Sequence, residues 1–145
     1  MPCLGCQLAN KELPVYVVFE DEHVCCILDH DPFNEGHVLI LTKQHVHDVD
    51  ELNEQTSLAI MKASRLLSKA LKRLFNPDGI TFTQNGGIFN DLTHYHMHAV
   101  PRYKEQSFAD FYGDKTVVIE QESVLKTTQR AMQQVIHELT MNHAI

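Results

Sequence analysis

Three histidines stand at alternate positions late in the chain: His94, His96 and His98. In an extended strand successive side chains point to opposite faces. We therefore expect the three imidazoles to share one face, while Tyr95 and Met97 pack in the core on the other. Neutral imidazole is both a metal ligand and a nucleophile near pH 7, so this row of rings predicts either a metal site or chemistry at a phosphorus centre.

The spacing of the three histidines favours phosphorus chemistry. A strand advances about 3.3 Å per residue, which places the Cα atoms of His94 and His98 about 13 Å apart. With metal–nitrogen bonds of about 2.0–2.1 Å, one ion could hold all three rings only if the outer side chains were nearly fully stretched. A row of hydrogen-bond donors, by contrast, suits phosphoryl transfer. A metal-dependent hydrolase with the three histidines as ligands remains the less favoured alternative.

The N-terminal Cys3-x-x-Cys6 has the spacing of half a tetrahedral zinc site. Two unrelated thiols are the alternative explanation in so short a segment. Cys25 and Cys26 lie next to each other in an apolar run, so we expect both to be buried core residues, as free cysteines often are.

The elements that must position these residues form an α+β pattern. Short strands joined by short turns, with one long amphipathic helix inserted, predict an antiparallel sheet of about five strands that carries this helix, followed by a C-terminal helix. The expected strands cover 15–19, 23–28, 37–42, 80–84 and 93–102, with a further strand at 116–120, and the expected helices cover 54–75 and 123–141.

Composition and charge narrow the class of protein. The chain has 145 residues and a formal net charge of −7, which suits one domain and argues against a nucleic-acid binder. Its apolar runs are far shorter than the ~20 residues that span a bilayer, and no signal peptide is evident. No P-loop or dinucleotide-binding glycine motif is present. We expect a soluble cytoplasmic protein with a small-molecule substrate.

With these residues, the sequence resembles the histidine triad (HIT) proteins, nucleotide hydrolases and transferases marked by His-x-His-x-His followed by apolar residues. The resemblance covers about residues 3–104 and implies a single domain over 1–145, with a HIT-like core and a C-terminal helical extension at about 105–145. Besides the triad, it rests on Cys3-x-x-Cys6, Gly36-His37-Val38-Leu39-Ile40, Lys43-x-His45 and Asn85-x-Gly87.

The resemblance also implies roles for individual residues. The middle histidine, His96, would attack the α-phosphate of an AMP conjugate and form a nucleotidyl-histidine intermediate that water resolves. His98 would contact the phosphate and the leaving group, supported by His37. The implied substrates are dinucleoside polyphosphates or nucleoside phosphoramidates. The implied nucleotide-binding residues are Asp29, His30, Asn85, Asn90 and His98.

Some of these roles have alternatives. The alternative for His37 is a residue that only begins a strand after a glycine. The alternative for Asp29 is a turn-forming residue, because it begins a segment rich in turn formers. Phe89-Asn90-Asp91 stands where the family usually has Gly-Gln-Ser/Thr, so Asp91 brings a negative charge near an anionic substrate. The second candidate function is therefore a nucleotide-binding, zinc-stabilised interaction module with little catalysis.

The resemblance extends to a metal and to an assembly. Several bacterial-type members complete a Cys₂His₂ zinc site with a histidine after the third strand and with the first triad histidine, which are His45 and His94 here. Such a site has no open coordination position and is structural. His47, two residues further along the chain, is a rival ligand. Family members are homodimers whose sheets join across the long helix and a strand, and we carry this over as an expectation.

Overall fold

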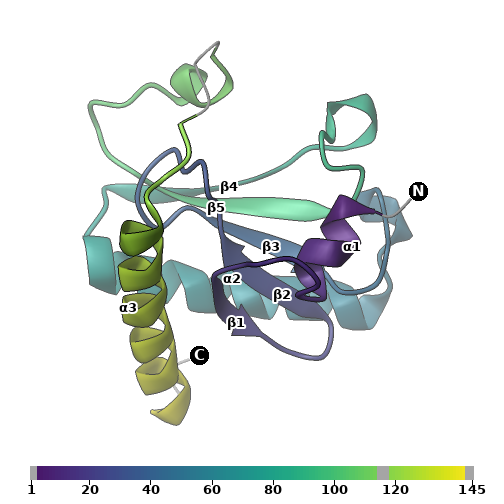
Figure 1. Cartoon of the computed structure of the whole chain (residues 1–145), viewed down its shortest axis with the longest axis horizontal. Coiled ribbons are helices and arrows are strands. Elements are labelled where there is room, and N and C mark those ends of the chain that lie inside the picture. Colours follow the sequence, from purple (N-terminus) through teal and green to yellow (C-terminus); the bar gives the residue numbers. More distant parts are fainter. Residues whose placement is uncertain (1–2, 114–117, 143–145) are drawn as a thin grey trace.

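A computed structural model of the chain describes residues 3–113 and 118–142, and it contains one five-stranded antiparallel sheet (Figure 1). The strands follow the order β1-β2-β3-β5-β4. Their bounds are Val17–Glu20 for β1, Val24–Leu28 for β2, Val38–Thr42 for β3, Gly79–Gln84 for β4 and His96–Arg102 for β5. The predicted antiparallel α+β sheet is confirmed.

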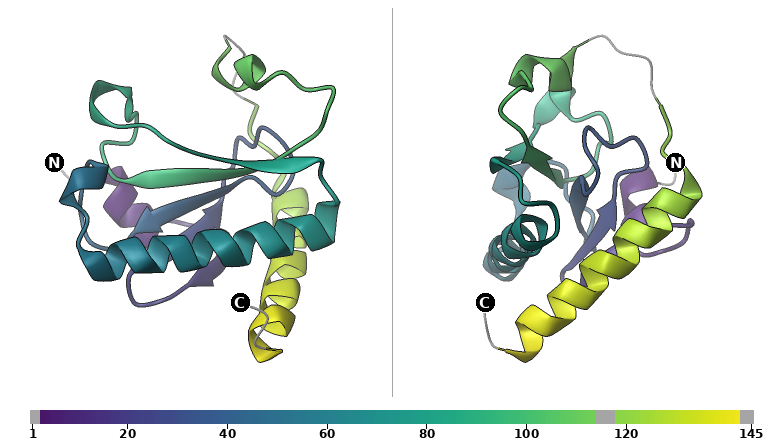
Figure 2. Two further views of the ribbon diagram at one scale, coloured as in Figure 1. Left: turned by 180° about the vertical axis from the view of Figure 1, so that it is seen from behind. Right: turned by 90° about the vertical axis from the view of Figure 1, so that its left-hand side faces the viewer.

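Helix α2 (Glu54–Phe75) covers one face of this sheet (Figure 2). It begins where the side chain of Asn53 accepts a hydrogen bond from the Thr56 N–H group, and it ends at Asn76, whose φ of 44° leaves the helical region. Its buried side lies against alternate strand residues. Those that face α2 include Val24, Cys26, Leu28, Val38, Ile40 and Ala99.

Helix α3 (Glu122–Met141) completes the same core by packing on α2 and β1, as the figure shows from the side (Figure 2). Its apolar residues join the cluster beneath α2: Leu125, Met132, Val135, Ile136 and Leu139. The predicted C-terminal helix is confirmed. No helix within the described residues is long and apolar enough to cross a membrane.

The opposite face of the sheet carries a short helix that the sequence did not predict, α1 (Leu4–Ala9), which contacts β2 and β3. One and a half turns give too short a stretch for helical periodicity to show, and Gly5 within it is a poor helix former. Gly5 allows the backbone of α1 to lie against the His94 side chain, because a Cβ atom at this position would lie 2.3 Å from the Cβ of His94. The helix is therefore held directly against the first triad histidine.

Some element boundaries differ from those predicted. The strand expected at 93–102 begins only at His96, because Thr93 has a φ of 53° and breaks the extended backbone. No strand is present at 118–120, although the N–H group of Glu120 donates to the carbonyl of His30. The remainder of the strand expected at 116–120 lies outside the described residues.

Candidate active site beside strand β5

The register of the sheet separates the two faces of β5 as the alternation predicted. His96 pairs with Leu41 and His98 pairs with Leu39, on the face away from α2. Tyr95 and Met97 belong to the core beneath α2. The rings of His96 and His98 are neighbours, with centroids 5.2 Å apart, so the strand presents two imidazoles side by side.

The backbone fixes the tautomer of His96. Its Nδ1 atom lies 2.9 Å from the carbonyl oxygen of His94, an atom that can only accept, so Nδ1 carries the hydrogen. The Nε2 atom of neutral His96 then holds a lone pair. This atom lies 3.6 Å from Oδ1 of Asp91, a largely exposed carboxylate. The structure thus leaves the Nε2 lone pair of His96 unengaged by the backbone and next to a negative charge.

A second chain of hydrogen bonds fixes His37 and His98. The N–H group of Phe33 donates to Nδ1 of His37 at 3.0 Å, so Nε2 of neutral His37 carries the hydrogen. It donates to Nδ1 of His98 at 2.8 Å. The remaining hydrogen of His98 is therefore on Nε2. Burial, with a smaller contribution from the nearby His96, lowers the pKa of His98 to about 4, so this ring is a neutral donor near pH 7.

Asp29 forms the turn that its sequence context predicted, and it also lies beside His37. One carboxylate oxygen accepts from the N–H group of Asp31 at 2.9 Å, as an Asx turn does. The other lies 3.6 Å from Nε2 of His37. Burial raises the pKa of Asp29 above its ordinary value. The turn and the position beside the histidines therefore coexist in one residue.

Two cavities meet at Asp29, Asp91 and His98. The first, which we call the apolar cavity, has a volume of about 350 Å³ and also reaches His96. The second, the aromatic cavity, has a volume of about 430 Å³. The apolar cavity is lined chiefly by Leu4, Leu8, Pro14, Val15, Tyr16, Ile27, Leu28, His30, Leu39 and Leu92. The aromatic cavity is completed by Asp31, Phe33, His37, Asn85, Phe89 and Phe111.

The remaining predicted nucleotide contacts fall in different places. His30 lines the apolar cavity and Asn85 lines the aromatic cavity. Asn90 lines neither, and its side chain is buried. The Asn90 amide nitrogen lies 3.2 Å from the carbonyl of His47 and 3.3 Å from that of His94. The structure thus assigns this amide to holding the turn before β5, because backbone carbonyls occupy it.

The sulfur and nitrogen atoms of Cys3, Cys6, His45 and His94 converge at the start of α1, all within 4.8 Å of one another. The Nδ1 atom of His94 lies 3.4 Å and 3.5 Å from the two sulfur atoms, and that of His45 lies 3.3 Å from Cys6 Sγ. A tetrahedral zinc ion with bonds of ~2.3 Å to sulfur and ~2.05 Å to nitrogen has sulfur–nitrogen edges of about 3.5 Å. The donor set fits zinc.

The orientation of His94 also fits a metal ligand. Its Nε2–H group donates to the carbonyl of Thr42 at 2.7 Å, which leaves the Nδ1 lone pair directed at the cysteines. His47 is not part of this cluster, and its Nδ1 lies 3.3 Å from Oδ1 of Asp48. The structure therefore places His45, and not the rival His47, beside Cys6.

A second group of possible ligands, Asp29, His37 and His98, has donor atoms equally close together. Its hydrogen bonds argue against a metal, because His37 Nδ1 accepts the Phe33 N–H group and the facing Nε2 atom carries a hydrogen instead of a lone pair. The outer triad rings thus turn to different partners: His94 to the cysteines and His98 to His37. The geometry does not gather the triad around one ion.

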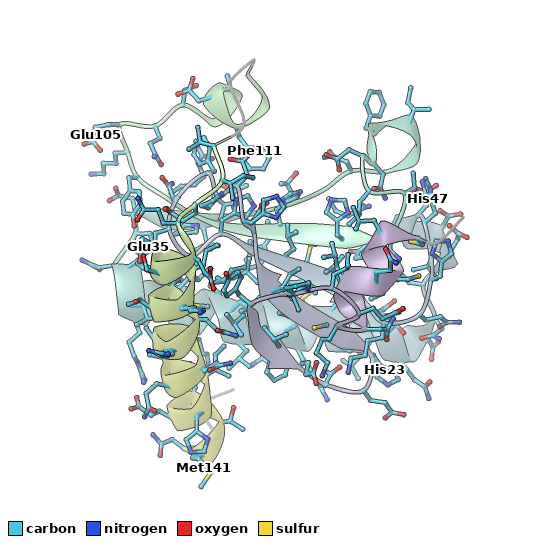
Figure 3. The ribbon with its side chains drawn as sticks, in the orientation of Figure 1. His23, Glu35, His47, Glu105, Phe111 and Met141 are labelled. Carbon is cyan, nitrogen blue, oxygen red and sulfur yellow. The ribbon has the colours of Figure 1, made fainter. Side chains whose placement is uncertain are left out.

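Several residues of the site were missed from the sequence. Thr42 and the backbone of Phe33 orient histidines, and Phe111 covers the pair formed by His37 and His98, with ring centroids 5.8 Å and 5.5 Å away. In Figure 3 the labelled Phe111 reaches from its loop toward the sheet. None had a signal in the sequence, because each acts through a backbone group or a contact distant along the chain.

Comparison with known proteins yields consistent matches. The HIT domain family matches residues 10–105. A HIT-like protein of Borreliella burgdorferi is 32% identical over 117 residues, which cover 78% of this chain and 84% of that protein. An adenylylsulfatase of Arabidopsis thaliana is 29% identical over 102 residues, which cover 69% of this chain and 52% of the enzyme.

Solved structures agree with the sequence comparison. A histidine triad nucleotide-binding protein of Sulfolobus tokodaii superposes with a TM-score of 0.81 at 28% identity, covering 95% of this chain and 94% of that one. A zinc-bound histidine triad family protein of Mycobacterium smegmatis gives a TM-score of 0.79 at 25% identity and covers 98% of both chains.

Proposed function

This chain belongs to the HIT family, and from that membership and its site we propose that it is a hydrolase or nucleotidyl transferase acting at the α-phosphate of AMP conjugates. Family members include an adenylylsulfatase. The observation that carries the proposal is the orientation of His96. Its Nδ1–H group is held by the His94 carbonyl, so its Nε2 lone pair is available for attack on phosphorus.

The two cavities suggest how a conjugate would lie. The apolar cavity suits a nucleoside, with Asp29 at its edge able to accept hydrogen bonds from ribose hydroxyls. The phosphate would lie at His96 and His98, where the cavities meet, and the leaving group would enter the aromatic cavity.

The first chemical step is an in-line displacement. The His96 Nε2 lone pair forms a bond to phosphorus while the bond to the leaving group breaks, and its electron pair departs with that group. A phosphate or sulfate leaves as an anion, whereas a leaving amine also takes up a proton from water. The Nε2–H group of His98 can donate a hydrogen bond to a phosphate oxygen or to the departing atom.

In the second step, water attacks the same phosphorus atom. A new phosphorus–oxygen bond forms, the bond to His96 Nε2 breaks, and its electron pair returns to the imidazole. One proton of the water molecule is released. Another hydroxyl compound in place of water gives nucleotidyl transfer by the same route. His37 keeps His98 in the donor tautomer throughout.

We further propose that the cluster of Cys3, Cys6, His45 and His94 binds structural zinc. The support is the match of the sulfur–nitrogen distances to those of a tetrahedral zinc site, together with a zinc-bound relative. Four protein ligands leave no open position for a substrate. The ion would tie α1 to the sheet and fix the ring of His94, whose carbonyl orients His96.

Turnover of AMP conjugates tests the proposed function. Wild-type protein would be incubated with adenosine phosphosulfate, a diadenosine polyphosphate and an adenosine phosphoramidate, and AMP release would be followed. We expect His96→Ala to abolish release, while the exposed His137→Ala on α3 retains it. Binding of AMP without turnover of any conjugate would favour the interaction module instead, for which the position of Asp91 is the specific argument.

A further inference from the structure

We propose that the aromatic cavity recognises a leaving group that carries a positive charge, such as an ammonium or guanidinium group attached to an aromatic or apolar body. This inference rests on the proposed function and adds specificity to it. The cavity is lined by three phenylalanines and three aspartates. Its chemistry therefore differs from that expected around a polyphosphate chain.

The aromatic rings that line the cavity favour a cationic ligand. Phe33 and Phe111 pack edge to face with centroids 5.5 Å apart, and Phe111 meets His98 at the same distance. Phe89 lines the cavity from the opposite loop and remains 74% exposed. Faces of aromatic rings attract organic cations and exclude water around them. Rings from three separate loops thus line the place where a leaving group would lie.

The loops that carry Phe89 and Phe111 lie on one side of the sheet. Figure 1 shows the teal loop that carries Phe89 and the green loop that carries Phe111 projecting from the same side of the sheet. The neighbouring Ile88 is 93% exposed and does not line the cavity. Phe89 and Ile88 therefore form a natural pair for comparison: two large apolar side chains on one turn, of which one faces the cavity.

The carboxylates that line the aromatic cavity also favour a cation. Asp91 is largely exposed, and its carboxylate lies at the junction of the cavities, 3.6 Å from His96 Nε2. Asp31 lines the aromatic cavity and accepts from the N–H group of Val118 at 3.2 Å. No lysine or arginine occurs among the described residues that line this cavity. A leaving group with several negative charges would face these carboxylates, whereas a cation would be attracted to them.

The chemistry at phosphorus restricts where the positive charge can be. His98 is a neutral donor, so the leaving atom departs most readily as a stable anion such as a phenolate or carboxylate, with the bonding electron pair. The cation must then be elsewhere on the leaving group, within reach of Asp31 and Asp91. The inferred substrate class is an AMP ester or mixed anhydride whose leaving group also bears an ammonium or guanidinium.

Three aryl esters of AMP test whether the aromatic cavity prefers a cationic leaving group. They carry a 4-aminomethyl, a 4-hydroxymethyl or a 4-carboxymethyl substituent on the phenyl ring, and so offer a cation, a neutral group and an anion. The ratios of kcat/KM would be measured in wild-type protein and in Asp31→Asn, Asp91→Asn and the double variant. Asp110→Asn removes one exposed charge from the loop of Phe111 without touching the cavity and is the matched control.

We expect wild-type protein to favour the ammonium ester over the neutral ester about 5- to 10-fold, from exposed charge pairs and ring faces together. The carboxylate ester should be the poorest substrate. The preference should fall toward unity in the double variant and persist in Asp110→Asn. Phe89→Ala should weaken it, whereas Ile88→Ala should not. Comparing each ratio between wild-type protein and a variant cancels the difference in intrinsic reactivity between the esters.

Two results would overturn the inference: equal or better turnover of the carboxylate ester, or a cation preference that survives in the double variant. Binding of the three esters to His96→Ala, measured by calorimetry, separates this inference from the proposed function. If wild-type protein hydrolyses no ester while His96→Ala binds the ammonium ester best, the proposed function fails and the cation subsite stands. If binding shows no preference for the cation, the subsite fails.

Discussion

The Nε2 atom of His37 and the Nδ1 atom of His98 lie 2.8 Å apart, although 61 residues separate them in the chain. Since His37 Nδ1 accepts the Phe33 N–H group, the shared hydrogen belongs to His37. His98 is thereby fixed as the tautomer whose Nε2–H group can donate. His37 thus determines which nitrogen of His98 carries the hydrogen.

Removing His37 should therefore impair catalysis through His98. We expect His37→Ala to lower kcat/KM for an AMP conjugate by about 10²-fold, the scale on which one positioned proton-transfer or donor group contributes. His30→Ala, which changes a histidine of the apolar cavity, is the control and should raise KM more than it lowers kcat. Activity unchanged in His37→Ala would contradict the assigned hydrogen-bond chain.

Stability should respond to pH through His98. Burial lowers its pKa from the ordinary 6.5 to about 4, so between these values the unfolded chain binds more protons than the folded one. Stability therefore falls as the pH drops from 6.5 to 4 and loses nothing more from this group below 4. The loss is at most about 3.5 kcal/mol, from 1.4 kcal/mol per unit of pKa.

A variant isolates this contribution from the others. Burial raises the pKa of Asp29, whose effect on stability has the opposite sign at low pH. Urea unfolding of wild-type protein and of His98→Asn at several pH values gives the difference that belongs to His98. We expect the stability of the wild type relative to His98→Asn to decrease as the pH falls through the window. A flat difference would show that His98 titrates normally.

Gly5 should be required for the N-terminal cluster. A methyl group there would lie 2.3 Å from the Cβ and Cγ atoms of His94, so Gly5→Ala must displace α1 or His94. We expect a loss of about 1–3 kcal/mol in stability, as for overpacked cores, and reduced zinc content by elemental analysis. Gly79→Ala is the control, because nothing lies within 4 Å of its Cβ position. Equal behaviour of both variants would argue against the close approach.

Zinc removal should act through stability and not through the chemical step. We expect chelation, or Cys6→Ser, to lower the thermal midpoint while activity declines slowly, with the unfolding of the protein. Parallel time courses of activity and of far-ultraviolet circular dichroism check this. Immediate loss of activity with an intact fold, reversed at once by added zinc, would instead support a catalytic metal.

The homodimer implied by the family resemblance remains a proposal, and the outer side of α2 and edge strand β4 is where it can be tested. Met61 on α2 and Phe82 on β4 are exposed side chains that line one shallow depression, together with Lys69 and Lys72. We expect a dimer by light scattering and a monomer for Phe82→Glu. Met141→Glu, at an exposed site on α3, should leave the dimer intact.

Much of this site was predictable because period-two alternation places side chains reliably. The shared face of His96 and His98, the long helix and the pairing of Cys6 with His45 followed from alternation, amphipathic periodicity and family motifs. The contacts of Asn90 could not be predicted, because a sequence shows an amide but not the backbone carbonyls that it contacts in the fold. Helix α1 was missed because its order comes from contact with β2 and β3 and not from its own composition.

The mass of the protein during turnover tests the central role of His96 most directly. Wild-type protein would be quenched with a slow AMP conjugate and analysed intact and after digestion. We predict that one nucleoside monophosphate becomes attached to His96, and that His96→Ala carries none while retaining the fold. AMP release without any such adduct, at undiminished rate in His96→Ala, would contradict nucleophilic catalysis by this histidine.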